Sequence, residues 1–167
     1  MRREILVVRA RGKPRRYEVM PLPTTNHQLP TANCLLPTME ILGIGTDITE
    51  CLRIARMVER HADLFVNRVY TPEEIQYCQH RKQSTQHFTG RWAAKEAVLK
   101  ALGTGWRRGI SWRDVEVRNE SGGKPIVVLR GGAKAAADEI GVTSVLVSIS
   151  HCHTHATAYA VAVGESK

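Results

Sequence analysis

Three side chains of this sequence have the chemical types needed to bind a metal ion and a phosphate group. Asp47 ends a short apolar run that begins at Glu40, and Glu96 and Lys100 stand four residues apart in a helix-forming segment. Mg²⁺ binds carboxylate oxygens and keeps several water or phosphate ligands. If Asp47 and Glu96 meet across their two segments, they predict a magnesium site beside Lys100, where charge on a reacting phosphoryl group is neutralised.

Each of these residues also has a simpler interpretation. Asp47 at the end of a strand is typical of a turn or of a helix cap. Glu96 and Lys100 have the spacing of a solvated helix pair, worth ~0.3–0.5 kcal/mol. Spacing alone does not decide between these interpretations and a metal site.

Three alternating histidines, His151, His153 and His155, form a second candidate metal site. On a strand they would share one face, which is a geometry for zinc and would suit a zinc hydrolase. If the strand instead breaks near Ser150 and His151, then His151 stands alone beside the first site. Both alternatives stay open at this point.

The common nucleotide-binding motifs are absent. Gly43 and Gly45 begin a dinucleotide fingerprint, but the position of its third glycine is Ile48. The sequence also lacks the P-loop pattern, which argues against nucleotide triphosphate hydrolysis.

The elements that must position these residues can be predicted in order along the chain. A strand over 40–48 precedes a helix that Thr49 caps, with Cys51, Ile54, Ala55 and Val58 on its apolar face. Arg53, Arg56 and Arg60 form a basic stripe on another side of this helix, which an ordinary solvated face would also explain.

Further elements follow from capping and turn signals. Thr71-Pro72-Glu73-Glu74 starts a helix that runs to about Gln79, and a long helix over about 86–102 ends at Gly103. Strands over 115–118 and 126–129 form a hairpin, and a short helix over 134–140 leads to strands over 144–149 and 156–163. This order predicts an α+β fold, with a mainly antiparallel sheet packed around a long central helix.

Length and composition predict one folded domain, residues 39–167, after a basic head. The chain has 167 residues, of which 43% are hydrophobic, and a formal net charge of +8. Residues 1–38 hold seven Lys or Arg against two Glu, a net charge of +5, together with five prolines. We expect this head to be a disordered extension before a start at Met39; a nucleic-acid-binding arm and a transit peptide are the alternatives.

The sequence also bears on location. It has no apolar run near the ~18 residues of a membrane span and no signal-peptide core, and its four cysteines are far apart. We expect a cytoplasmic protein with reduced thiols, no membrane partner and no nucleic-acid partner.

Taken together, five segments resemble the holo-acyl-carrier-protein synthase branch of the 4′-phosphopantetheinyl transferases. They are 43–48 (GIGTDI), 89–101 (TGRWAAKEAVLKA), 103–105 (GTG), 123–125 (GKP) and 148–151 (SISH). They occur in the family's order and cover essentially residues 39–164.

This resemblance implies an activity: transfer of 4′-phosphopantetheine from coenzyme A to a serine of apo-acyl carrier protein, in fatty acid biosynthesis. It implies that Asp47 and Glu96 bind Mg²⁺, which also holds the coenzyme A diphosphate, and that Lys100 contacts the phosphate and assists proton transfer. The base that accepts the serine proton stays open between Glu96 and Lys100.

The resemblance also implies the remaining contacts. Arg91, Lys95 and His151 match basic positions around the nucleotide phosphates; Gly103, Thr104 and Gly105 match the pantetheine path; and Lys124 and Pro125 match the border of the adenine. The stripe of Arg53, Arg56 and Arg60 matches the helix that docks the acidic carrier protein. The resemblance further implies a homotrimer with coenzyme A at subunit interfaces.

Overall fold

The computed structural model describes residues 39–107 and 109–165 of the chain. The head at 1–38, on which the extension hypothesis and Cys34 fall, lies outside these ranges. The described elements follow in the order β1 (Glu40–Glu50), α1 (Cys51–Val69), α2 (Pro72–Gln79), α3 (Ser84–Ala101), the 3₁₀ turn η1 (Trp112–Asp114), β2 (Val115–Asn119), β3 (Pro125–Leu129), α4 (Gly131–Glu139), β4 (Val142–His151) and β5 (His155–Gly164).

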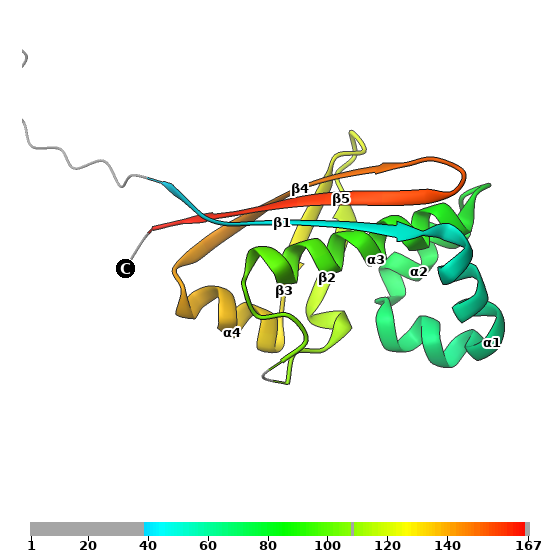
Figure 1. The fold of residues 1–167 in the computed structure, drawn as a ribbon, viewed down its shortest axis with the longest axis horizontal. Coiled ribbons are helices and arrows are strands. Elements are labelled where there is room, and N and C mark those ends of the chain that lie inside the picture. The colour runs from blue at the N-terminus through cyan, green and yellow to red at the C-terminus, as the bar shows by residue number, and fades with distance from the viewer. Residues whose placement is uncertain (1–38, 108, 166–167) are drawn as a thin grey trace, which may run out of the picture. The chain divides into compact units, whose positions relative to one another are not determined.

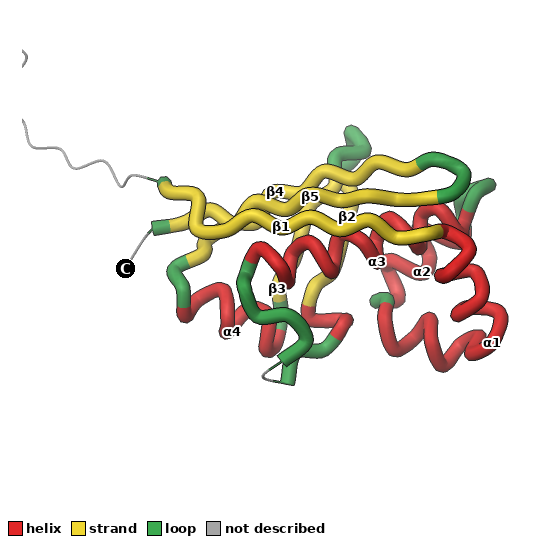
Figure 2. The backbone as a smooth tube through the Cα atoms, viewed as in Figure 1, coloured by secondary structure: helices red, strands yellow, loops and turns green. Residues whose placement is uncertain are grey.

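The five described strands form two sheets, and every strand pair in them is antiparallel. β5 lies between β1 and β4 in a three-stranded sheet, and β2 and β3 form a separate hairpin. The long helix α3 lies along one face of the three-stranded sheet, while α1 and α2 lie together at one end (Figures 1 and 2). This arrangement confirms the predicted α+β class, with an antiparallel sheet around a long helix.

Two glycines allow β1 to lie directly on α3. A Cβ atom at Gly45 would stand 1.9 Å from the Ala97 carbonyl oxygen, and one at Gly43 would stand 2.0 Å from that of Ala101. Any larger residue would push the strand away from the helix. Because alternate strand residues share a face, Asp47 lies on the same side of β1 as these glycines and faces α3.

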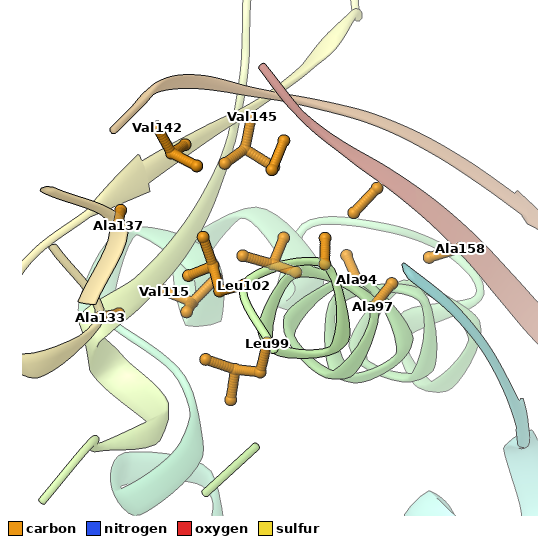
Figure 3. Packing of buried hydrophobic residues seen from close by; sticks show 14 of the residues in the cluster. Ala94, Ala97, Leu99, Leu102, Val115, Ala133, Ala137, Val142, Val145 and Ala158 are labelled. Carbon is orange, nitrogen blue, oxygen red and sulfur yellow. The ribbon is translucent and has the colours of Figure 1, made fainter. Parts of the chain in front are cut away.

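Small side chains fill the main core between α3 and the sheet. Ala94 and Ala97 of α3 meet Ala158 of β5, and Leu99 lies among other buried side chains of the same cluster (Figure 3). A second cluster with many aromatic rings, built around Phe65, Tyr70, Phe88 and Trp92, joins α1 and α2 to α3. The two clusters hold α3 rigidly, so its polar residues have fixed positions.

Helix starts were predicted with unequal success. Thr71 caps α2 in a complete capping box with Glu74, which confirms the predicted start. The prediction for Thr49 is wrong: this residue is buried within β1, and the N-cap of α1 is Glu50. The predicted short helix at 134 begins earlier, at Gly131.

Two further expectations concern the described residues alone. Cys51, Cys78 and Cys152 are free thiols, which confirms the prediction for these three. Among the described helices, none is both long and apolar enough to cross a bilayer.

Candidate active site

The carboxylate of Asp47 is held by two neighbours at the contact between β1 and α3. Lys100 Nζ lies 2.8 Å from Asp47 Oδ1 and donates to the Thr46 carbonyl oxygen over 2.9 Å. Thr49 Oγ1 donates to Asp47 Oδ2 over 2.7 Å. The side chains of Asp47 and Lys100 are 15% and 49% exposed, so a ligand can reach them. Two oxygens, Oδ1 of Asp47 and the Thr46 carbonyl, therefore already hold a cation.

Glu96 lies one helical turn before Lys100 on α3 and is half-buried. Its Oε1 accepts a hydrogen bond of 3.0 Å from Trp106 Nε1. The chain reaches Trp106 through a turn in which Gly103 and Gly105 have φ of 69° and 54°, values that favour glycine. Lys100 thus joins α3 to Asp47 of β1, and Glu96 lies one helical turn away on α3, bonded to Trp106.

The described residues contain no cluster of three or more His, Cys, Asp or Glu side chains able to hold a metal ion. The resemblance assigns two carboxylates, Asp47 and Glu96, to a metal whose other ligands would come from water or substrate. That ligand set suits Mg²⁺, which keeps several waters and binds phosphate oxygens. The lysine ammonium on Asp47 shows that the position attracts positive charge.

A cavity of about 610 Å³ lies beside α2 and the β2–β3 hairpin. Its lining includes Tyr77, Arg81, Arg91, Asn119 and Gly123. The guanidinium carbons of Arg91 and Arg81 lie 3.9 and 4.4 Å from the centre of the Tyr77 ring. Arg118 adds a third arginine to the lining, and Glu73 and Glu120 add two carboxylates. The positive charges outnumber the negative ones beside the Tyr77 ring, which suits an anionic ligand with a flat ring.

Two buried polar atoms have no hydrogen-bond partner among the described residues: Arg91 Nε and Thr104 Oγ1. The Arg91 side chain is otherwise fixed by a bond of 2.7 Å from its guanidinium to Asn119 Oδ1. Unpartnered buried polar atoms are uncommon, and each calls for an explanation. Both belong to residues that the resemblance assigns to cofactor binding, which is consistent with a ligand completing these bonds.

The expected phosphate contact of Lys95 is corrected by the structure. The Lys95 side chain is 0% exposed, and its Nζ lies 2.8 Å from a carboxylate oxygen of Glu74, which is buried equally. The same ammonium donates to the carbonyl oxygens of Trp112 and Val115. Burial lowers the pKa of Lys95, and the Glu74 carboxylate opposes that shift. The ammonium is turned into the protein because it joins α2, α3 and β2.

The histidines do not form a shared metal site. His151 is the exposed last residue of β4, and its ring centre lies 5.3 Å from that of His87. His153 is near Gln86, while His155 begins β5 and contacts Thr154. Because β4 ends at His151 and β5 begins at His155, the three histidines do not share one strand face as the zinc alternative requires. Burial, and then the neighbouring His151, lowers the pKa of His87.

Gly123, Lys124 and Pro125 lie at the turn of the β2–β3 hairpin. Gly123 lines the cavity, and its carbonyl oxygen accepts a hydrogen bond of 2.8 Å from Asn119 Nδ2. Lys124 is exposed, and Pro125 begins β3. The expected adenine border therefore lies at or beside the cavity.

The basic stripe on α1 is exposed at all three positions, Arg53, Arg56 and Arg60. The guanidinium carbon of Arg53 lies 5.8 Å from the ring centre of Trp92. The stripe is free to meet a charged partner, although nothing in the fold requires one.

Three residues that line the cavity or contact Glu96 were not predicted from the sequence: Tyr77, Arg81 and Trp106. Tyr77 and Arg81 are four apart on and just after α2, a spacing that places them on one helix face. That spacing could have identified the pair. Trp106 follows the glycine turn, and no local signal ties it to Glu96.

Comparison with known proteins now places the chain in a family. The family model for the 4′-phosphopantetheinyl transferase superfamily matches residues 43–163. The holo-[acyl-carrier-protein] synthase of Koribacter versatilis is 46% identical over 118 residues, which is 71% of this chain and 94% of that protein. The holo-ACP-synthase structure from Plasmodium yoelii has a TM-score of 0.67 at 34% identity, covering 77% of this chain and 99% of that one.

A further structure, the Helicobacter pylori holo-[acyl-carrier-protein] synthase in complex with coenzyme A, has a TM-score of 0.64 at 31% identity. The match covers 71% of this chain and 98% of the Helicobacter pylori chain. The chain therefore belongs to the 4′-phosphopantetheinyl transferase superfamily.

Proposed function

We propose that this chain transfers 4′-phosphopantetheine from coenzyme A to a serine of apo-acyl carrier protein and releases adenosine 3′,5′-bisphosphate. The observation that carries the proposal is the match of residues 43–163 to this superfamily, and the ion pair between Lys100 of α3 and Asp47 of β1 supports it. The relatives that it matches over nearly their full length are holo-[acyl-carrier-protein] synthases. Formation of adenosine 3′,5′-bisphosphate that depends on an apo-carrier tests the proposal.

Asp47 and Glu96 would hold the Mg²⁺. When bound there, the metal supplies positive charge against the coenzyme A diphosphate and the phosphoryl group in transfer. Lys100 forms an ion pair with Asp47. Its side chain is exposed enough to turn toward a phosphate oxygen.

The transfer forms one bond and breaks one bond. The carrier serine Oγ attacks the phosphorus that bears the pantetheine arm, and the bond from that phosphorus to the bridging oxygen breaks. Adenosine 3′,5′-bisphosphate leaves with that oxygen. The serine proton passes to a base, and Glu96 and Lys100 are the two candidates for it.

The nucleotide of coenzyme A is assigned to the cavity beside α2. Arg91 and Arg81 supply positive charge there, Tyr77 supplies an aromatic face, and the adenine border is at Lys124 and Pro125. His151 is exposed near His87, within reach of solvent-facing phosphate. Thr104, with Gly103 and Gly105, is assigned to the pantetheine path, where its unpartnered hydroxyl supports the assignment.

Separate surfaces for the two substrates predict separate kinetic effects. Arg91→Gln should raise KM for coenzyme A about tenfold, because a hydrogen bond to a charged group is worth ~1.5–3 kcal/mol. Arg56→Gln, on the exposed α1 stripe, should raise KM for the carrier and leave KM for coenzyme A unchanged, since carrier docking depends on complementary charge. Steady-state kinetics with each substrate varied in turn checks both, and equal effects of both variants on both constants would contradict the assignment.

A homotrimer is supported by an apolar face on the three-stranded sheet. On the side away from α3 lie Ile44, Ile48, Leu146 and Tyr159, all more than half exposed. Monomeric proteins rarely leave contiguous apolar patches of this kind in water. We assign this face to contact between copies of the chain, with part of each active site contributed by a neighbour.

The assembly can be tested by light scattering coupled to gel filtration. The wild-type chain should elute at three times its monomer mass of 18.6 kDa. Ile48→Asp places a charge on the sheet face and should give monomers, because an unpaired buried charge is strongly unfavourable. Leu64→Asp, at an exposed apolar position on α1, is the matched control and should remain trimeric. A monomeric wild type would contradict the assignment.

The remaining parts of the proposal concern context. We assign the reaction to the cytoplasm, with the carrier of fatty acid biosynthesis as substrate. We also propose that residues 39–167 form the catalytic domain and that residues 1–38 are an extension with no part in transfer. Support for that boundary is the family match, which begins at residue 43.

A further inference from the structure

The indole of Trp106 makes a direct hydrogen bond to a proposed metal ligand. Trp106 Nε1 donates to Glu96 Oε1 over 3.0 Å, and the bond is partly buried. Among the residues that the structure describes, Glu96 Oε2 has no hydrogen-bond donor. The two oxygens of Glu96 are therefore unequal, since one is held by the protein and the other is left for a ligand.

Trp106 is itself held by a stack of aromatic rings. Its ring centre lies 3.5 Å from that of Trp112, which lies 4.1 Å from that of Trp92 on α3. Both pairs are tilted by close to 30°, with interplanar angles of 35° and 32°. Trp92 is buried in the second core cluster, and Trp106 packs against the first. The stack thus anchors the indole to both cores of the domain.

The segment that carries Trp112 is also fixed. Ser111 and Asp114 form a capping box around η1, so the backbone at Trp112 has a defined conformation. Lys95 adds a bond from its buried ammonium to the Trp112 carbonyl oxygen. These contacts fix the backbone of the segment that carries Trp112.

We propose that Trp106 is a positioning residue that fixes the Glu96 carboxylate for metal binding. This inference rests on the proposed function, since it requires that Glu96 is a ligand of the divalent ion. A hydrogen bond to one carboxylate oxygen restricts the rotation of the carboxylate plane and directs the other oxygen at the metal. The Trp106 N–H is needed for this role, because phenylalanine at this position would keep an aromatic ring and lose the donor.

The test is Trp106→Phe, with metal binding measured independently of turnover. Outer-shell partners of metal ligands typically contribute 10–100-fold in affinity. We expect about tenfold weaker Mn²⁺ binding by electron paramagnetic resonance, with Mn²⁺ as the probe and no substrate present. The Mg²⁺ concentration for half-maximal transfer should rise by the same factor, while kcat at saturating Mg²⁺ changes by less than about threefold.

Trp112→Phe is the matched control, because Trp112 belongs to the same stack and reaches Glu96 only through Trp106. It should lower the melting temperature at least as much as Trp106→Phe and leave Mn²⁺ affinity near that of the wild type. Trp106→His, which keeps a ring N–H, should recover part of the lost affinity. This second variant also serves if Trp106→Phe fails to fold.

Two results would overturn the inference alone, provided that the wild type transfers phosphopantetheine. One is unchanged Mn²⁺ affinity in Trp106→Phe; the other is an equal loss of affinity in Trp106→Phe and Trp112→Phe, which indicates general loosening of the fold. A wild type that neither binds Mn²⁺ nor modifies the carrier overturns the proposed function, and this inference with it.

Discussion

Replacing Glu96 with glutamine is expected to lower kcat about 100-fold while the melting temperature stays within about 2 °C of the wild type. The substitution keeps the shape of the side chain and the acceptor for Trp106 Nε1, and it removes one of the two carboxylate charges at the site. Outer-shell partners of metal ligands contribute 10–100-fold, so a direct ligand belongs at the upper end of that range. Initial rates of adenosine 3′,5′-bisphosphate formation measure the effect.

A matched control is Glu40→Gln, at an exposed position at the start of β1. It removes the same charge from the chain and should leave kcat unchanged, since long-range effects of an exposed charge are screened by salt. Wild-type activity in Glu96→Gln, at any Mg²⁺ concentration, would remove Glu96 from the metal site and from the role of base.

Lys95→Met is expected to destabilise the fold by about 3–5 kcal/mol. Breaking a buried ion pair by removing one partner leaves an uncompensated charge in the interior, which is the source of this cost. Here the charge left behind is that of Glu74, which is 0% exposed and also accepts a hydrogen bond from the Val117 N–H. Urea denaturation followed by circular dichroism measures the change in the free energy of unfolding.

Lys100→Met separates this structural role from a role at the phosphates. Lys100 lies on the same helix, and its ion pair with Asp47 is half-exposed, so its loss should change the free energy of unfolding by less than about 1 kcal/mol. It should, however, lower the rate of transfer. If Lys95→Met instead retained wild-type stability and raised KM for coenzyme A, the original assignment of Lys95 to the nucleotide phosphates would be restored.

The contrast between Lys95 and Lys100 shows where prediction from sequence ends. Both lysines stand on one helix, and the family resemblance gives both a place near phosphate. Their burial differs because residues five apart point about 140° apart around a helix, and only the packing of α2 and β2 decides which direction is interior. A buried lysine is uncommon, so composition gives no warning of the pair with Glu74.

Local signals predicted the elements well where a single interaction decides them. The capping box at Thr71 and the glycine turn after α3 fix chain conformation within a few residues, and both were found. Thr49 had the right type for a cap, but pairing with β5 continues through it to Glu50 and overrides the local preference. Strand pairing between distant residues is invisible to a local pattern.

The candidate site was predictable only in part, because residue types can be read from the sequence and contacts between distant segments cannot. Asp47 and Glu96 were chosen by residue type and by resemblance, and the close approach of Gly45 to Ala97 explains how β1 comes to lie directly on α3. The Trp106 bond and the pairing of Arg81 and Arg91 on Tyr77 depend on the path of loops and on helix orientation. Those features require three-dimensional coordinates.

The most direct measurement is the intact mass of an apo-acyl carrier protein after incubation with the purified chain, coenzyme A and Mg²⁺. Our account predicts that the carrier gains the mass of one phosphopantetheine group at its serine, that a chelator abolishes the gain and that added Mg²⁺ restores it. A carrier whose mass stays unchanged with the wild-type chain and Mg²⁺ would contradict the account.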